Sequence, residues 1–97
     1  PANGFRMIWR APFACTVTNV RGYVDAGTTT QINAFKGSLA TPTDFLATDN
    51  IIGTPDVWDD GGAVQNASVA AGDAVGVEIA VAGTAAEVTI QIDVTRP

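Results

Sequence analysis

Apolar and polar residues alternate most regularly in two stretches near the end of the chain, residues 75–81 and 88–94. Val and Ile occupy every second position of both stretches, and small or polar residues stand between them. A period of two is typical of a β-strand with one buried face. Residues 82–85 separate the two stretches, so the pattern predicts an antiparallel hairpin whose apolar face needs a second layer to cover it.

Shorter stretches with strand character precede this hairpin. Residues 5–10, 16–24 and 28–36 are rich in β-branched and aromatic side chains, and the apolar segments 51–52 and 63–69 are shorter still. One region differs: residues 41–46 place Thr, Pro and Asp in the order that opens a helix, which predicts one helical turn held down by Phe45 and Leu46. About seven to eight short strands separated by turn residues predict an all-β fold, an antiparallel β-sandwich.

The predicted strand phases place several apolar or small side chains on outer faces. These side chains are Ile8, Tyr23, Phe35, Ala74, Gly76 and Ala80. An outer face of this kind favours burial against a second protein surface. The alternative is an error of phase, for example a β-bulge near Asn19 that would turn Tyr23 inward.

Composition narrows the class of protein. The chain has 97 residues, of which 46% are apolar and 15% are charged. This length predicts a single domain over residues 1–97, and the composition argues against disorder. The net charge of −5 argues against a nucleic-acid partner, because phosphate binding needs clustered Lys and Arg. No apolar run approaches the length of a membrane span, so no membrane partner is expected.

Few residues suit chemistry. The sequence has no His, so a Ser–His or Cys–His nucleophile pair cannot form within one chain, and we expect neither an enzyme nor a cofactor. The single Cys15 excludes an intramolecular disulfide. Acidic side chains on loops are weak candidates for Ca²⁺, although Asp in such places is more often a turn residue. These candidates are Asp49, Asp56, Asp59 and Asp60.

The layout from Phe5 onward resembles the small jelly-roll domains of tailed-phage virion proteins. The resemblance is carried by two segments, TVTNVRGYVDAGTTTQINAFKG, which has the form strand–turn–strand, and VAAGDAVGVEIAVAGTAAEVTIQIDV, a Gly-Asp turn followed by two long closing strands. It implies a sandwich of jelly-roll type. Similar domains serve as capsid decoration (cement) proteins or as fibre and spike modules, usually as homotrimers.

The resemblance therefore implies a structural virion protein that binds the assembled phage head and stabilises it. Its partners would be further copies of itself, as a homotrimer, and the major capsid protein. It would be made in the bacterial cytoplasm and reside on the capsid surface. Arg6 and Arg10 are candidates for docking onto an acidic capsid surface. The other expected contact residues are Phe5, Ile8, Trp9, Tyr23, Phe35, Ala74, Gly76 and Ala80.

A second hypothesis is a binding module, the carbohydrate- or receptor-recognising tip of a tail fibre or spike. It requires an exposed aromatic platform, above all Trp58, with Ca²⁺ on the neighbouring Asp loop as an additional element. Against it, Trp is more often a core or interface residue than a sugar platform. Glycan titration followed by Trp fluorescence separates the two hypotheses.

Overall fold

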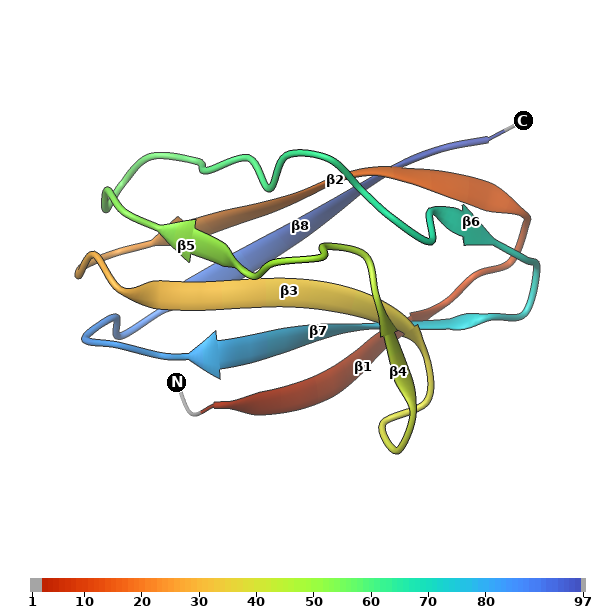
Figure 1. Ribbon diagram of the computed structural model, residues 1–97, viewed down its shortest axis with the longest axis horizontal. Helices are drawn as coiled ribbons and strands as arrows, with labels where there is room; N and C mark the ends of the chain where they lie inside the picture. The colour runs from red at the N-terminus through yellow and green to blue at the C-terminus, as the bar shows by residue number, and fades with distance from the viewer. Residues whose placement is uncertain (1–2, 97) are drawn as a thin grey trace.

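The computed structural model describes residues 3–96, and over these residues eight strands form two antiparallel sheets (Figure 1). The strands are β1 (Gly4–Arg10), β2 (Cys15–Val24), β3 (Thr30–Gly37), β4 (Pro42–Asp44), β5 (Asn50–Ile52), β6 (Ser68–Val69), β7 (Ala74–Val81) and β8 (Val88–Thr95). Sheet A has the order β1-β7-β3-β4, with β5 also paired to β3. Sheet B has the order β6-β2-β8. The all-β prediction is confirmed.

Buried side chains of both sheets meet in a shared core. Val17 and Val20 of β2 and Val75 of β7 belong to one buried cluster, which Phe45 and Leu46 also join. A smaller cluster contains Val24, Ile32, Ile52 and Ala85. The buried positions of β2 follow a period of two on either side of one interruption between Val17 and Val20, as expected for a strand that buries one face.

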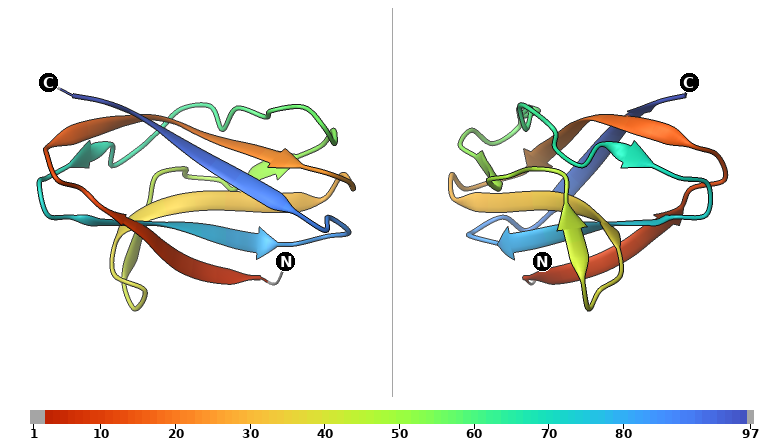
Figure 2. Two further views of the ribbon diagram at one scale, coloured as in Figure 1. Left: turned by 180° about the vertical axis from the view of Figure 1, so that it is seen from behind. Right: turned by 45° about the vertical axis from the view of Figure 1, so that its right-hand side comes forward.

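The predicted hairpin between residues 75–81 and 88–94 is wrong. β7 pairs with β1 and β3 in sheet A, whereas β8 pairs with β2 in sheet B. The connection between them crosses from one sheet to the other (Figure 2). Two side chains hold the ends of this connection. Thr30 Oγ1, at the start of β3, donates to the carbonyl oxygen of Ala82 at 2.9 Å, and the Asp25 carboxylate in the β2–β3 turn accepts from the N–H groups of Ala86 and Glu87. Alternation identifies a strand with one buried face, but it does not identify the strand's partner.

The predicted helical turn at residues 41–46 is also wrong, because residues 42–44 form β4 and pair with β3. Phe45 and Leu46 are nevertheless buried as predicted. Asn33 of β3 fastens this segment, because its side chain donates to Leu46 O at 3.0 Å and accepts from Leu46 N at 3.1 Å. Within residues 3–96 the structure contains no helix that is long and apolar enough to cross a membrane.

The remaining predicted strands are present, with shifted ends. Residues 5–10, 16–24 and 28–36 correspond to β1, β2 and β3, and residues 51–52 lie in β5. The predicted strand at 63–69 shrinks to the two residues of β6.

β2 contains the bulge that was the alternative explanation for its phase. Its register against β8 shifts between Val17 and Asn19. The bulge does not turn Tyr23 inward, since the alternating positions Val20 and Val24 are the buried ones. Arg21 and Tyr23 therefore lie together on the outer face of sheet B, as the phase of the sequence predicts.

The strand pairings are nested along the chain. β1 pairs with β7, β2 with β6, and β3 with both β4 and β5. The chain from β1 to β7 therefore resembles one long hairpin whose paired strands alternate between the two sheets. β8 does not belong to this nested series and pairs with the edge of β2 opposite β6. As a result β1 ends sheet A and β8 ends sheet B, and both strands face the viewer when the molecule is seen from behind (Figure 2).

Candidate binding surfaces

The candidate Ca²⁺ ligands have other partners. Asp49 Oδ1 accepts from the Asn33 side chain at 2.9 Å, and Asp60 forms an ion pair with Arg21. Asp59 is held through its backbone against β2. No group of three or more His, Cys, Asp or Glu that could hold a metal occurs among residues 3–96.

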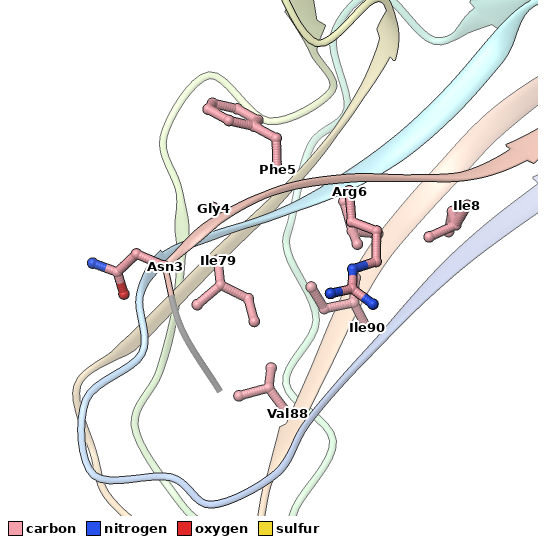
Figure 3. A pocket seen from close by; sticks show the side chains of 9 residues that line it. Asn3, Gly4, Phe5, Arg6, Ile8, Ile79, Val88 and Ile90 are labelled. Atoms are coloured by element: carbon pink, nitrogen blue, oxygen red, sulfur yellow. The ribbon is translucent and has the colours of Figure 1, made fainter.

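A hollow of about 490 Å³ lies between the end strands β1 and β8, above β7 (Figure 3). We call it the open flank, and it is lined by Asn3, Gly4, Phe5, Arg6, Ile8, Val77, Ile79, Val88 and Ile90. Val77, Ile79 and Ile90 have the inward phase of core residues, yet they are only partly buried. The two sheets therefore leave part of their inner faces uncovered on this side.

The register of β1 on β7 determines which side chains face the open flank. Arg6 pairs with Val77, and paired residues of neighbouring strands point to the same side of a sheet. Arg6 therefore points between the sheets, toward Ile90 of β8, whereas Phe5 points the other way (Figure 3). An arginine on the inner side of an end strand is unusual, because that position normally holds an apolar core residue.

The backbone of β1 is irregular at the same place. Its register on β7 shifts between Met7 and Trp9, so Ile8 is the extra residue, and its side chain is 51% exposed. A bulge and an inward charge are two devices by which proteins prevent indiscriminate pairing at a sheet edge. β1 has both, so any partner at the open flank must satisfy Arg6 as well as the apolar residues.

The two strands that border the open flank carry opposite charges. β1 contains Arg6 and Arg10 and no acidic residue. Neither arginine forms an ion pair, because the two ion pairs found among residues 3–96 are both formed by Arg21. β8 contains Asp93 and no basic residue, and Glu87 comes directly before it. Asp93, however, points to the outer face of sheet B, where it is ion-paired with Arg21, so the charge that lines the open flank itself is that of Arg6.

Two of the expected contact residues on the outer face of sheet A, Phe35 and Gly76, are buried. The ring of Phe35 is fully buried and meets the ring of Phe5 edge-on, with centroids 5.6 Å apart. A Cβ at Gly76 would lie 2.4 Å from the Phe35 ring. Gly76 therefore makes room for a side chain of its own chain, and Phe35 and Gly76 present no surface to a partner. Ala74, Ala80 and Trp9 are partly buried.

A second candidate surface lies on the outer face of sheet B. Residues 56–60 run beside β2, where Asp59 and Gly22 exchange two backbone hydrogen bonds of 2.8 and 2.9 Å. This pairing brings Trp58 next to Tyr23, with ring centroids 5.4 Å apart and ring planes at 51°. The Tyr23 hydroxyl donates to Asp56 at 3.1 Å, which fixes one side of the aromatic pair.

Arg21 stands beside this aromatic pair and is held from two sides. Its Nε donates to Asp93 at 2.7 Å, and its Nη1 donates to Asp60. Gln91 Nε2 donates to the other oxygen of Asp93, also at 2.7 Å. A shallow hollow of about 300 Å³ is lined by Arg21, Trp58, Gln91 and Asp93. We call the surface formed by Arg21, Tyr23, Trp58, Asp60, Gln91 and Asp93 the aromatic platform.

The charges of the platform are fixed by the same hydrogen bonds. The hydrogen bond from Gln91, and to a smaller extent the one from Arg21, lowers the pKa of Asp93, so this carboxylate is ionised at neutral pH. The hydrogen bond to Asp93 raises the pKa of Arg21. The hydrogen bond to Asp56 raises the pKa of Tyr23, so its hydroxyl keeps its proton. The platform therefore offers a fixed pattern of donors and acceptors across the physiological pH range.

Comparison with protein-family models, with curated proteins and with solved structures finds no match to this chain. The resemblance to jelly-roll virion proteins accordingly rests on the sequence pattern alone.

Sequence reasoning found the platform only in part. Tyr23, Trp58 and Asp60 were singled out separately, whereas Arg21, Gln91 and Asp93 received no role. Arg21 pairs with Gln91 across β2 and β8. Both side chains have the outward phase in the sequence pattern. This phase predicts that they are neighbours only if β8 pairs with β2, whereas the predicted hairpin paired residues 88–94 with residues 75–81.

Proposed function

We propose that this chain is a structural virion protein, a capsid decoration (cement) protein of a tailed phage that binds the assembled head and stabilises it as a homotrimer. The observation that carries the proposal is the open flank, where apolar inner-face residues lie uncovered between two strand edges. Exposed apolar surface of this kind favours burial against another protein. The nested strand pairings support a sandwich of jelly-roll type, the fold of the domains that the sequence resembles.

The subunit contact in this proposal is the open flank against the flank of the next copy. The apolar side chains along β1 of one subunit then lie against those along β8 of its neighbour, so the uncovered apolar residues of the open flank are buried. Such a contact uses two different surfaces and closes into a ring when the rotation between subunits fits, as it does in a trimer. The ring buries Ile8 and Ile90.

Docking on the capsid then uses surface that the ring leaves free. Arg10 is exposed at the end of β1, and its side chain has the charge to meet an acidic capsid surface. A protein that binds the assembled shell but not its separate subunits stabilises the shell by mass action.

The first test is the solution mass of the protein by light scattering over a range of concentrations. We expect a mass three times that of the 10.0 kDa chain. Ile8→Glu is expected to dissociate the trimer, because it places an unpaired negative charge in an apolar contact. Leu39→Glu is the matched control, since Leu39 is 53% exposed and Ile8 is 51% exposed, but Leu39 lies outside the open flank.

A wild-type protein that stays monomeric at every concentration would refute the trimer, and equal dissociation by both variants would refute the assignment of the contact. The decoration role is tested separately with phage heads that lack the protein. Addition of the protein is expected to raise the temperature at which the heads break, and Arg10→Ala is expected to weaken binding. Heads that fail to bind the wild-type protein would overturn the decoration role.

A further inference from the structure

The aromatic platform has features that an architectural role does not require. Trp58 belongs to neither buried cluster, and its side chain is 45% exposed. Trp at a protein surface commonly marks a contact, because a large apolar ring with one polar N–H is suited to a partner that has both characters. Tyr23 supports the ring from one side, so Trp58 presents a firm apolar face next to a polar cluster.

Arg21 is the centre of that polar cluster. Asp93 and Asp60 engage its Nε and Nη1, and the guanidinium carries further N–H groups that remain for a ligand. Gln91 uses its amide N–H on Asp93, which leaves its carbonyl oxygen as an acceptor. The polar atoms are thus held in place before a ligand arrives, and pre-organisation of this kind reduces the entropy lost on binding.

Shape and charge narrow the class of ligand. The hollow of about 300 Å³ is at the small end of ligand pockets, which run from about 300 to 1,000 Å³. Around it, Asp56, Asp60 and Asp93 outnumber the single cation Arg21. This balance disfavours phosphates, sulfates and acidic sugars, since a second anion would meet more like charge than opposite charge. The fitting ligand is neutral and small, with one apolar face and a ring of hydroxyl groups.

We propose that the aromatic platform binds a neutral saccharide. One pyranose ring lies with its apolar C–H face on Trp58, while neighbouring hydroxyl groups accept from Arg21 and donate to Asp60 and to the Gln91 carbonyl. This site is separate from the open flank, because it lies on the outer side of sheet B. It goes beyond the decoration role and would let a virion that carries many copies of the protein adhere to glycans.

The test is a titration of the full chain with four neutral oligosaccharides: maltopentaose, cellopentaose, mannopentaose and chitopentaose. The Trp9→Phe variant makes Trp58 the only Trp, so a change in fluorescence reports on the platform. We expect a saturable change with at least one of these probes and a dissociation constant on the order of 1 mM, since one stacked ring and a few hydrogen bonds contribute. A heparin tetrasaccharide is expected to produce none.

Calorimetry with the probe that binds then compares variants. Trp58→Ala is expected to lower the affinity at least about tenfold, through loss of the stacked ring. Val57→Ala is the matched control, because Val57 is the adjacent residue and is 54% exposed, but it does not line the hollow. Arg21→Lys is expected to weaken binding although the charge is kept, because a lysine cannot reproduce the planar fork.

The proposal is overturned if none of the four saccharides gives a saturable change, if only the heparin fragment binds, or if Trp58→Ala and Val57→Ala lose affinity equally. Light scattering of Trp58→Ala supplies the last control. An unchanged solution mass shows that loss of glycan binding is a property of the platform and not of the assembly.

Discussion

Substitution of Gly76 by Ala tests how the outer face of sheet A is packed. A Cβ at this position would lie 2.4 Å from Phe35 Cζ and 2.6 Å from the backbone oxygen of Arg6. Approaches this close are not sustained by real Cβ atoms, so either the ring or the β1 backbone must move. Phe35 is fully buried and β1 is hydrogen-bonded to β7, so neither can move freely.

The size of the effect follows from two opposing contributions. Forcing an extra carbon into a packed site costs about 1–3 kcal/mol. Because the backbone at Gly76 does not have positive φ, replacing Gly with Ala also restricts the unfolded chain and returns about 0.4–1 kcal/mol. We therefore expect Gly76→Ala to lower the free energy of unfolding by about 0–2.6 kcal/mol. In a domain of this size each kcal/mol lowers Tm by about 4–8 °C.

Urea unfolding measures this loss, with Gly53→Ala as the control. A Cβ at Gly53 would meet nothing within 4 Å, so that variant should be neutral or slightly more stable. A double-mutant cycle with Phe35→Leu identifies the cause, because the loss at position 76 should shrink once the aromatic ring is gone. Equal stability of Gly76→Ala and Gly53→Ala, or full additivity with Phe35→Leu, would refute the packing argument.

Three further predictions concern buried and charged groups. Asn33→Leu should lower the free energy of unfolding by about 2–5 kcal/mol, because it leaves the buried Leu46 N–H and C=O unpaired; a urea midpoint equal to that of wild type would contradict this. Backbone hydrogen bonds from Glu87 and Ala86 lower the pKa of Asp25 below its ordinary value of 3.8. The stability that the ionised carboxylate contributes is therefore present above pH 3.8 and is lost as the pH falls through the lowered pKa. Asp25→Asn should therefore flatten the acid part of the stability–pH curve, and an unchanged curve would show that the carboxylate has no such role. Burial, together with the negative charges of Asp49 and Asp44, raises the pKa of Glu78. Glu78→Gln should therefore stabilise the fold at neutral pH and lose this advantage below pH 4.5. A variant that is less stable than wild type at neutral pH would contradict this.

Features that depend on local periodicity were predictable from the sequence. The outward position of Arg21 and Tyr23 follows from the burial of Val20 and Val24 at alternating positions, and the bulge near Asn19 explains the irregular start of that strand. The burial of Phe45 and Leu46 was equally predictable, because two adjacent large apolar residues in a polar loop need cover.

Features that depend on which strands meet were not predictable. Residues 75–81 and 88–94 have the same pattern whether they pair with each other or face each other from opposite sheets, and the short connection permits both. The same limit applies to Phe35, whose outward phase suggested exposure. It is buried because Phe5 of β1 packs against its ring and Gly76 of β7 leaves space beneath it, and these residues come from distant parts of the chain.

β8 links the two proposed surfaces, because its alternate side chains point to opposite sides of sheet B. Ile90 faces inward and lines the open flank, whereas the next residue, Gln91, faces outward and lines the aromatic platform. Adjacent residues on a strand are separated by the thickness of the sheet, so a substitution at one leaves the other surface in place. Ile90→Ala should therefore weaken assembly without changing saccharide affinity, and Gln91→Ala should do the reverse. If either variant altered both properties together, the two surfaces would be coupled through β8, and the separate roles assigned to its two faces would be wrong.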